Sequence, residues 1–277
     1  MSISVNSINA ASNLAVTPLA PDTSLSGAAL AQSTGDATLA SSPVTVAPLD
    51  PRQTSARLAQ YLKALDAPLV MGADAQNILN ALVPTMQSIV AQRPDLANAQ
   101  FDFQSSNGSI QVISSTLSAS DKSWIQAKLN GNSALVQSVQ SFHDDAVAGY
   151  ATWADADGSP LTQEQSNAVS KQADGLVSFL NLFQSLGNAA QQSLMKDGTY
   201  TAPDGTTANL AQNPTSAAGF LQFANSAQAF ANGTVSFISN SGHNAYGNKL
   251  NIFDNDTVMP NFFPSSQTTS LGVDEVA

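Results

Sequence analysis

Residues 99–114 read AQFDFQSSNGSIQVIS, and this stretch changes the pattern of the chain from helical to strand-like. Apolar and polar residues alternate on both sides of a central Asn-Gly pair, with apolar residues at Phe101, Phe103, Ile110 and Val112. A period of two is typical of a half-buried strand, and Asn107-Gly108 favours the positive φ angles of a type I′ turn. The stretch therefore predicts a β-hairpin over 101–113. Two strands are marginally stable alone, so one face of the hairpin must pack against a helix.

Helical patterns precede the hairpin. Asp50 is a suitable N-cap, Pro51 suits the first helical position, and Gln53 could complete a variant of the capping box, so a helix should begin here. Its apolar residues recur at helical spacing, at Leu58, Leu62 and Leu65, with Tyr61 beside them. A second helical pattern covers 73–93. Pro84 interrupts it and predicts a kink or two short helices, and Pro94 ends it.

Helical patterns also follow the hairpin. Ser118 and Asp121 form a capping box, Gly131 is a stop signal, and a longer amphipathic pattern follows over 133–155. Thr162 with Gln165 should cap the longest helix, which we expect at the centre of the core. Its apolar stripe consists of Val169, Ala173, Leu176, Leu180, Phe183, Ala190 and Leu194. Two Asp-Gly pairs near 198–208 predict a small hairpin or an ordered loop, and a last helix is expected over about 216–230.

These patterns predict a mainly α, α+β fold with one helical domain over 50–235. Residues 1–49 are dominated by Ser, Thr, Ala and Pro, and their scattered apolar residues form no stripe. Such a segment cannot bury enough surface to offset its ordering entropy, so we expect a disordered leader. Residues 236–277 are rich in Asn, Gly and Ser and are expected to form an irregular segment and a tail.

The composition disfavours several classes of function. Only 10% of the 277 residues are charged, and the net charge is -11. This charge repels a phosphate backbone and disfavours electrostatic docking on anionic lipid, so we expect no nucleic-acid partner. The chain has no Cys, which excludes disulfides and thiolate chemistry. The first residues lack the basic region and apolar run of a secretory signal peptide, and no segment is long and apolar enough for a membrane helix.

Two stretches resemble metal sites without completing one. Asp155, Asp157 and Ser159 occupy the first, third and fifth positions of an EF-hand calcium loop. The loop needs Gly at the sixth position and an acid at the twelfth, where this chain has Pro160 and Ser166, so an Asp-rich turn is favoured over calcium binding.

His143 precedes Asp144 and Asp145, and a His-Asp pair occurs in metal-dependent phosphohydrolases. Such a centre needs further histidines, and the chain offers only His243, so a histidine at a helix surface is favoured. The sequence contains neither a G-x-S-x-G elbow nor a phosphate-binding Gly-rich loop. We therefore assign no catalytic, cofactor-binding or metal residue and expect no cofactor.

The leader resembles the N-termini of substrates of type III secretion and flagellar export systems of Gram-negative bacteria. The resemblance rests on an alternation of short apolar and polar residues over 2–9, SISVNSIN, and on the Ser/Ala/Pro-rich stretch up to residue 49. It implies an export signal that includes Ile3, Val5 and Ile8. It also implies protein partners, among them a secretion chaperone and a host or apparatus protein.

We therefore expect a bacterial virulence protein, secreted by a Sec-independent route, that acts by macromolecular interaction as an effector or as an accessory or translocation-associated protein. Two alternatives stay open. One is a hydrolase or calcium-dependent enzyme of unknown substrate that uses Asp155, Asp157 or the His143 region. The other is a helical interaction module of the cytoplasm.

Overall fold

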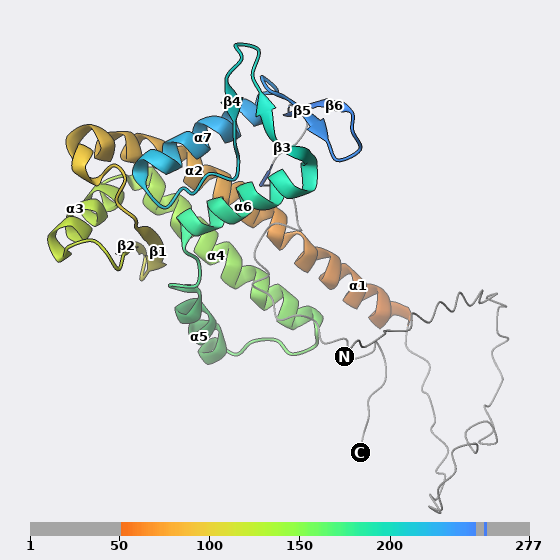
Figure 1. Ribbon diagram of the computed structural model, residues 1–277. Coiled ribbons are helices and arrows are strands. Elements are labelled where there is room, and N and C mark those ends of the chain that lie inside the picture. Colours follow the sequence, from red (N-terminus) through yellow and green to blue (C-terminus); the bar gives the residue numbers. More distant parts are fainter. Residues whose placement is uncertain (1–50, 248–251, 254–277) are drawn as a thin grey trace, which may run out of the picture. The chain divides into compact units, whose positions relative to one another are not determined.

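The computed structural model describes residues 51–247 and 252–253 (Figure 1). The leader, the export-signal residues Ile3, Val5 and Ile8, and the tail after 253 lie outside the described residues. The elements follow in the order α1 Pro51–Leu65, α2 Ala67–Gln92, η1 Pro94–Leu96, β1 Asp102–Ser106, β2 Ser109–Ile113, α3 Ala119–Asn130, α4 Ser133–Ala156, α5 Gln163–Ala173, α6 Phe179–Leu194, β3 Met195–Thr201, β4 Thr207–Ala208, α7 Ala217–Ala231, β5 Ser236–Ser239 and β6 Asn244–Tyr246. The fold is mixed, with helices and two antiparallel sheets.

The hairpin expected over 101–113 is present as β1 and β2. Phe103 pairs with Val112 and Ser105 with Ile110, and the turn residues Asn107 and Gly108 have φ angles of 46° and 73°. The apolar side of the hairpin is buried against α3, α4 and α6. Amide side chains of α3 complete the free edge of β2: Gln126 accepts the backbone N–H of Val112 and Asn130 accepts that of Ile110. The edge strand therefore has partners for its backbone.

The core is centred on α2, which contacts α1, α3, α4 and α7. Its buried apolar face includes Ile78, Leu82, Met86 and Ile89. The helix continues through Pro84 as one element, so of the two predicted outcomes, a kink or two short helices, the second is wrong. Asn132, the N-cap of α4, donates its amide to the carbonyl oxygen of Ala81 at 2.7 Å, close to the point where the proline removes a backbone donor.

The prediction of one long helix after Thr162 is wrong. The structure has two helices there, α5 and α6. The capping box of Thr162 and Gln165 is confirmed, but α5 ends at Ala173 and contains no buried residue, whereas α6 is buried. Leu176 of the predicted stripe is 53% exposed. The helix ends because Gly175 has a φ angle of 73° and donates its N–H to the carbonyl oxygen of Ser105 in the hairpin. A tertiary contact thus overrides the helical period.

The junction between β1 and α6 depends on Asp102. This side chain is 7% exposed, and its two oxygens accept the backbone N–H groups of Leu180 at 2.8 Å and Asn181 at 3.0 Å. Ser178, the N-cap of α6, makes no capping hydrogen bond through its own side chain. A strand residue therefore caps this helix, as an N-cap side chain otherwise would. Phe103 and Phe179 stack beside it at 5.2 Å between ring centroids.

The second sheet has the strand order β4-β3-β5-β6. The pairing of β3 with β4 supplies the small hairpin expected near 198–208. Strands β5 and β6 lie inside the segment predicted to be irregular, and β5 pairs with β3. The sheet is anchored by aromatic packing, because Phe230 of α7 contacts both Tyr200 of β3 and Phe237 of β5.

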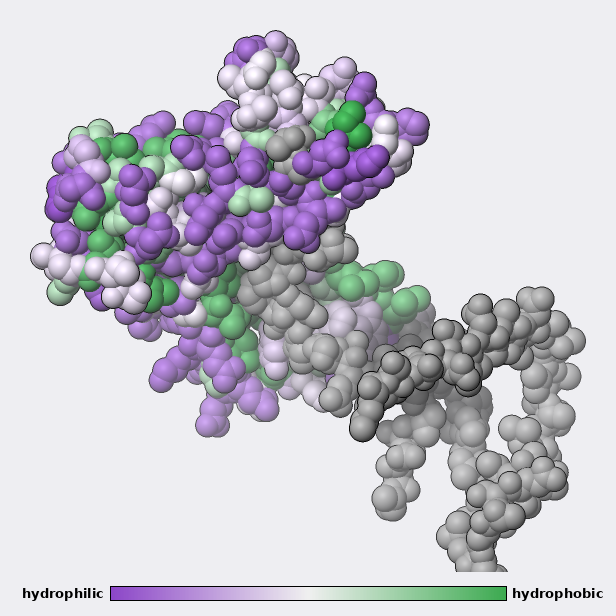
Figure 2. Space-filling model, in the orientation of Figure 1, coloured by the Kyte–Doolittle hydropathy of each residue, from purple (hydrophilic) through white to green (hydrophobic). Residues whose placement is uncertain are grey.

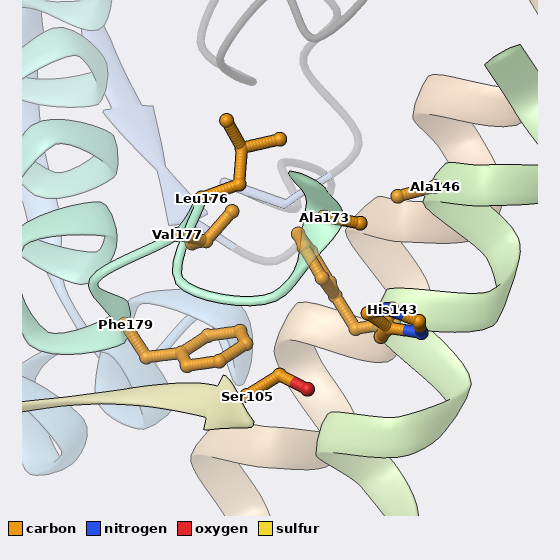
Figure 3. Close-up of a pocket in the computed structure, with 8 residues that line it drawn as sticks. Ser105, His143, Ala146, Ala173, Leu176, Val177 and Phe179 are labelled. Carbon is orange, nitrogen blue, oxygen red and sulfur yellow. The ribbon is translucent and has the colours of Figure 1, made fainter. Parts of the chain in front are cut away.

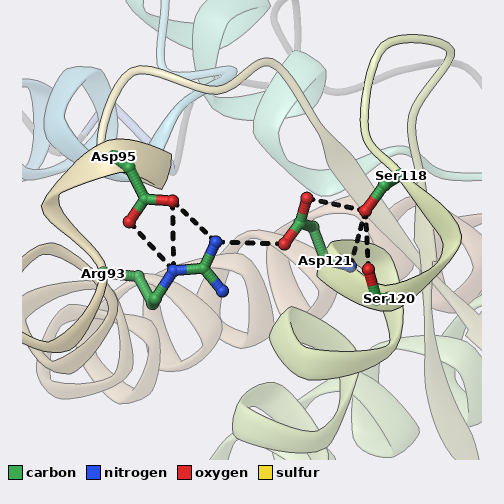
Figure 4. Close-up of polar contacts among 5 residues, drawn as sticks. All are labelled: Arg93, Asp95, Ser118, Ser120 and Asp121. Atoms are coloured by element: carbon green, nitrogen blue, oxygen red, sulfur yellow. Dashed lines mark hydrogen bonds and ion pairs between the residues drawn. The ribbon is translucent and has the colours of Figure 1, made fainter.

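Polar contacts fix the other end of α2 (Figure 4). Arg93 follows the helix and pairs with Asp95 of η1 at 2.6 Å and with Asp121 of α3 at 3.1 Å. Ser118 is the N-cap of α3, since its hydroxyl oxygen accepts the backbone N–H of Asp121 at 3.1 Å, so the cap is confirmed. The reciprocal half of the predicted capping box is replaced, because the Asp121 carboxylate accepts the hydroxyl of Ser118 at 2.7 Å. The carboxylate of Asp121 thus binds both the N-cap hydroxyl of α3 and the guanidinium of Arg93.

Candidate functional site

The structure places His143 of α4 in a polar cluster that joins α4, α5 and the hairpin. Figure 3 shows His143 with Ser105 of the hairpin and Ala173 of α5 around one small pocket. Its Nδ1 lies 3.0 Å from an oxygen of Asp144, and its Nε2 lies 2.9 Å from the carbonyl oxygen of Ser170. Asp174 lies 3.8 Å from Nε2. Burial lowers the pKa of His143, but the hydrogen bonds to Asp144 and Ser170 and the charge of Asp174 outweigh it, so the pKa is raised. Both ring nitrogens face acceptors, which favours the doubly protonated ring.

The geometry of this cluster does not match a nucleophilic triad. Ser105 donates its hydroxyl to Asp174 at 3.0 Å, and the other oxygen of Asp174 accepts the backbone N–H of Asn107. The serine is thus bonded to the acid, whereas catalysis needs it bonded to the histidine as its base. The adjoining cavity, lined by Ser105, His143 and Phe179 among others, has a volume of about 10 Å³. A cavity of this size has room for one water molecule and not for a substrate. The cluster therefore fits a structural role, in which it links α4, α5 and the hairpin.

Asp145 interacts with a residue of α2, whereas its neighbour Asp144 binds His143. It pairs with Asp74 of α2, whose side chain is 8% exposed and has one oxygen without a hydrogen-bond partner. Burial, with the hydrogen bond and charge of Asp145, raises the pKa of Asp74 to about 7. This pair could not be predicted from the sequence, because the two residues are far apart in the chain and each follows an ordinary helical pattern.

The residues considered for calcium are separated by a helix end. Asp155 lies within α4 and Asp157 is the C-cap. Asp157 accepts the hydroxyl of Tyr61 at 3.2 Å, so it ties α1 to α4. His243 lies in the turn between β5 and β6 and is exposed. Within 51–247 and 252–253, no three His, Cys, Asp or Glu side chains gather as a metal site.

An apolar face on α1 and the start of α2 is open to solvent. We call it the leucine face, and it consists of Leu58, Leu62, Leu65, Leu69 and Val70, which are 43–58% exposed. The side of α1 next to the leucines packs on α4, where Tyr61 meets the ring of Trp153 at 5.8 Å and Ala64 is 1% exposed. Green surface lies over α1 in Figure 2. The leucines expected to give α1 an apolar side thus do so, but that side is not covered by the core.

The leucine face is continuous across the junction of the two helices. Asp66 lies between them with φ and ψ angles of -74° and -21°, which are helical. Its carbonyl oxygen accepts the N–H groups of Leu69 at 3.1 Å and Val70 at 3.2 Å. The helical path therefore carries the side chains of α1 and early α2 onto one surface.

Two further hollows are partly apolar. A groove of about 140 Å³ lies between α4 and α5 and is lined by Tyr150, Val169 and Leu176 among others. A pocket of about 160 Å³ lies between α2 and α7 beside Phe253. Both are smaller than the roughly 300–1,000 Å³ of most small-molecule sites, so neither has the size of an active-site cleft.

No described helix has the length and hydrophobicity to cross a membrane. Comparisons with protein-family models, with curated proteins and with solved structures found no match for this chain.

Proposed function

We propose that this chain is a bacterial protein exported by a type III-like route and that it acts by binding other proteins. The observation that carries the interaction part is the leucine face. Leu58, Leu62 and Leu65 are each more than half exposed, and contiguous apolar surface of this kind marks interaction sites in soluble proteins. The polar clusters of the described residues support the same choice, since His143 and Asp74 bind neighbouring elements and border no large cleft.

The composition of residues 1–49 supports the export part. These residues contain no Lys or Arg and carry the alternation of Ile3, Val5 and Ile8 with Ser and Asn. An apparatus that threads chains through a narrow channel needs a segment that does not fold stably, and a segment poor in apolar stripes meets this need. The absence of Cys also makes the fold independent of the redox state of its destination.

The test of export is secretion of a reporter fused to residues 1–50. We expect the reporter in the culture medium of a strain with a working type III apparatus and not in that of the same strain with the apparatus inactivated. A matched fusion with Ile3, Val5 and Ile8 replaced by Ser should be secreted less. Retention of the unmodified fusion in both strains would contradict export and would leave the helical interaction module of the cytoplasm as the better description.

A further inference from the structure

The leucine face has the residue spacing of a coiled-coil seam. Leu58, Leu62, Leu65 and Leu69 are separated by four, three and four residues, which are the intervals between the d and a positions of a heptad. A surface with this spacing is complementary to another helix with the same spacing, because each leucine then inserts between four residues of its partner. The spacing thus indicates a helix as the occupant of the leucine face.

We propose that the occupant is the leucine face of a second copy of this chain, so that two copies pair α1 against α1 in a twofold-symmetric dimer. This inference rests on the proposed interaction function. A twofold interface uses one patch twice, and the seam contains only leucine at its a and d positions, so it can face itself without placing a charge in the contact.

The charges near the leucine face allow two copies of the chain to approach each other there. The chain carries a net charge of -11, so most pairs of surfaces on two copies repel each other. Residues 55–70 carry only Arg57, Lys63 and Asp66, which is two bases against one acid. This face is therefore free of the acid–acid repulsion that the rest of the chain would impose. The same balance disfavours an anionic membrane as the occupant, because two basic groups give little attraction against the acidic remainder.

The size of the face indicates a weak dimer. Five side chains that are 43–58% exposed cover less surface than the roughly 800 Å² per partner of a standard interface. The dimer should therefore form at high concentration and dissociate on dilution. Such an equilibrium would let the same face be released for export or for another helix.

Sedimentation velocity of the full chain over a wide concentration range tests the proposal. We expect the apparent mass to rise from 28.6 kDa towards twice that value as concentration increases. Leu62→Glu should weaken association by at least ~10-fold, since it places a charge in the seam. Leu176→Glu is the matched control, because Leu176 is exposed to a similar extent, 53%, on another surface, and it should leave the dimer intact. Circular dichroism should show both variants to be folded, since both positions are exposed.

Cysteine cross-linking determines which faces meet. The chain has no Cys, so Leu62→Cys introduces a single thiol. In a parallel pair two such thiols face each other and should form a disulfide-linked dimer under mild oxidation. In an antiparallel pair a cross-link should appear only when Leu62→Cys is mixed with Leu65→Cys. Leu176→Cys should give no comparable cross-link.

A monomeric mass at every concentration, or a dimer unaffected by Leu62→Glu, would overturn the proposal. Binding of the monomer to vesicles of anionic lipid, lost in Leu62→Glu, would also overturn it and assign the face to a membrane. These results are independent of the reporter assay. Secretion of the reporter with a monomeric chain would refute the dimer alone, and a dimer without secretion would refute export alone.

Discussion

Replacing Asp74 with Asn should stabilise the fold above neutral pH. Asp74 is 8% exposed and faces Asp145 across the contact between α2 and α4, and burial first, then the hydrogen bond and charge of Asp145, raise its pKa from 3.8 to about 7. At 1.36 kcal/mol per pKa unit, this difference corresponds to about 4 kcal/mol. We expect about half, ~2 kcal/mol, because Asp145 is only partly buried and solvent screens the pair.

The sign of the pH dependence follows from the raised pKa. The folded chain keeps the proton of Asp74 where the unfolded chain has lost it, so stability falls as pH rises from 3.8 to about 7 and is constant above that pH with respect to this group. Asn does not titrate. Urea unfolding should therefore show Asp74→Asn to be more stable than the wild type by about 2 kcal/mol at pH 8 and by less than about 1 kcal/mol at pH 5.

The matched control is Asp197→Asn, which removes the same charge at an exposed position of β3 and should change stability by less than ~0.5 kcal/mol. If Asp74→Asn were no more stable than the wild type at pH 8, or if its advantage were equal at both pH values, the pairing of Asp74 with Asp145 would not be the cause.

Three more outcomes follow from the packing. Asp102→Ala removes the carboxylate that accepts two backbone N–H groups at the start of α6, and urea unfolding should show that the free energy of unfolding falls by about 3 kcal/mol. A fall of less than ~1 kcal/mol would refute the role of Asp102 as the cap of α6. Burial lowers the pKa of His143, but hydrogen bonds to Asp144 and Ser170 raise it more, so the folded chain holds the proton more tightly than the unfolded chain. The wild type should therefore exceed His143→Gln in stability most below about pH 6.5, and this advantage should decline as pH rises through the pKa of the folded state. An equal advantage at pH 5 and pH 9 would contradict this. Gly187→Ala places a methyl group against the backbone carbonyl of Leu210 and should cost about 3 kcal/mol, and an unchanged Tm would show that this contact is loose.

The sequence predicted best where a local rule and a tertiary contact require the same conformation. The hairpin is an example, because Asn107-Gly108 sets the turn and the alternation of Phe103 with polar residues sets the buried side. The caps of Ser118 and Thr162 are others, since each satisfies its own helix start through a residue three positions along. In these cases the information lies within a few neighbouring residues.

The prediction failed where distant residues decide. The break between α5 and α6 depends on Asp174 binding Ser105 and on Gly175 binding the same strand. The pair Asp174-Gly175 is a local turn signal that the helical stripe outweighed in the prediction, and the strand that it binds lies some seventy residues earlier, outside 162–194. Strand β5 is a different case, because Val235 and Phe237 are buried and alternate with Thr234 and Ser236, which is a local strand pattern that the prediction of an irregular segment from 236 overlooked.

The leucine face shows why an interaction surface is harder to predict than a helix. Leu58, Leu62 and Leu65 would have the same spacing whether the core of this chain or another molecule covered them, because a helical period reports which residues share a side and not what lies against it. What distinguishes the cases is the side of α1 that contacts α4. Tyr61 and Ala64 hold the helix on α4, and Leu58, Leu62 and Leu65 stay more than half exposed beside that contact. The leucines therefore stay at the surface of the described fold, where the second copy that we propose can reach them.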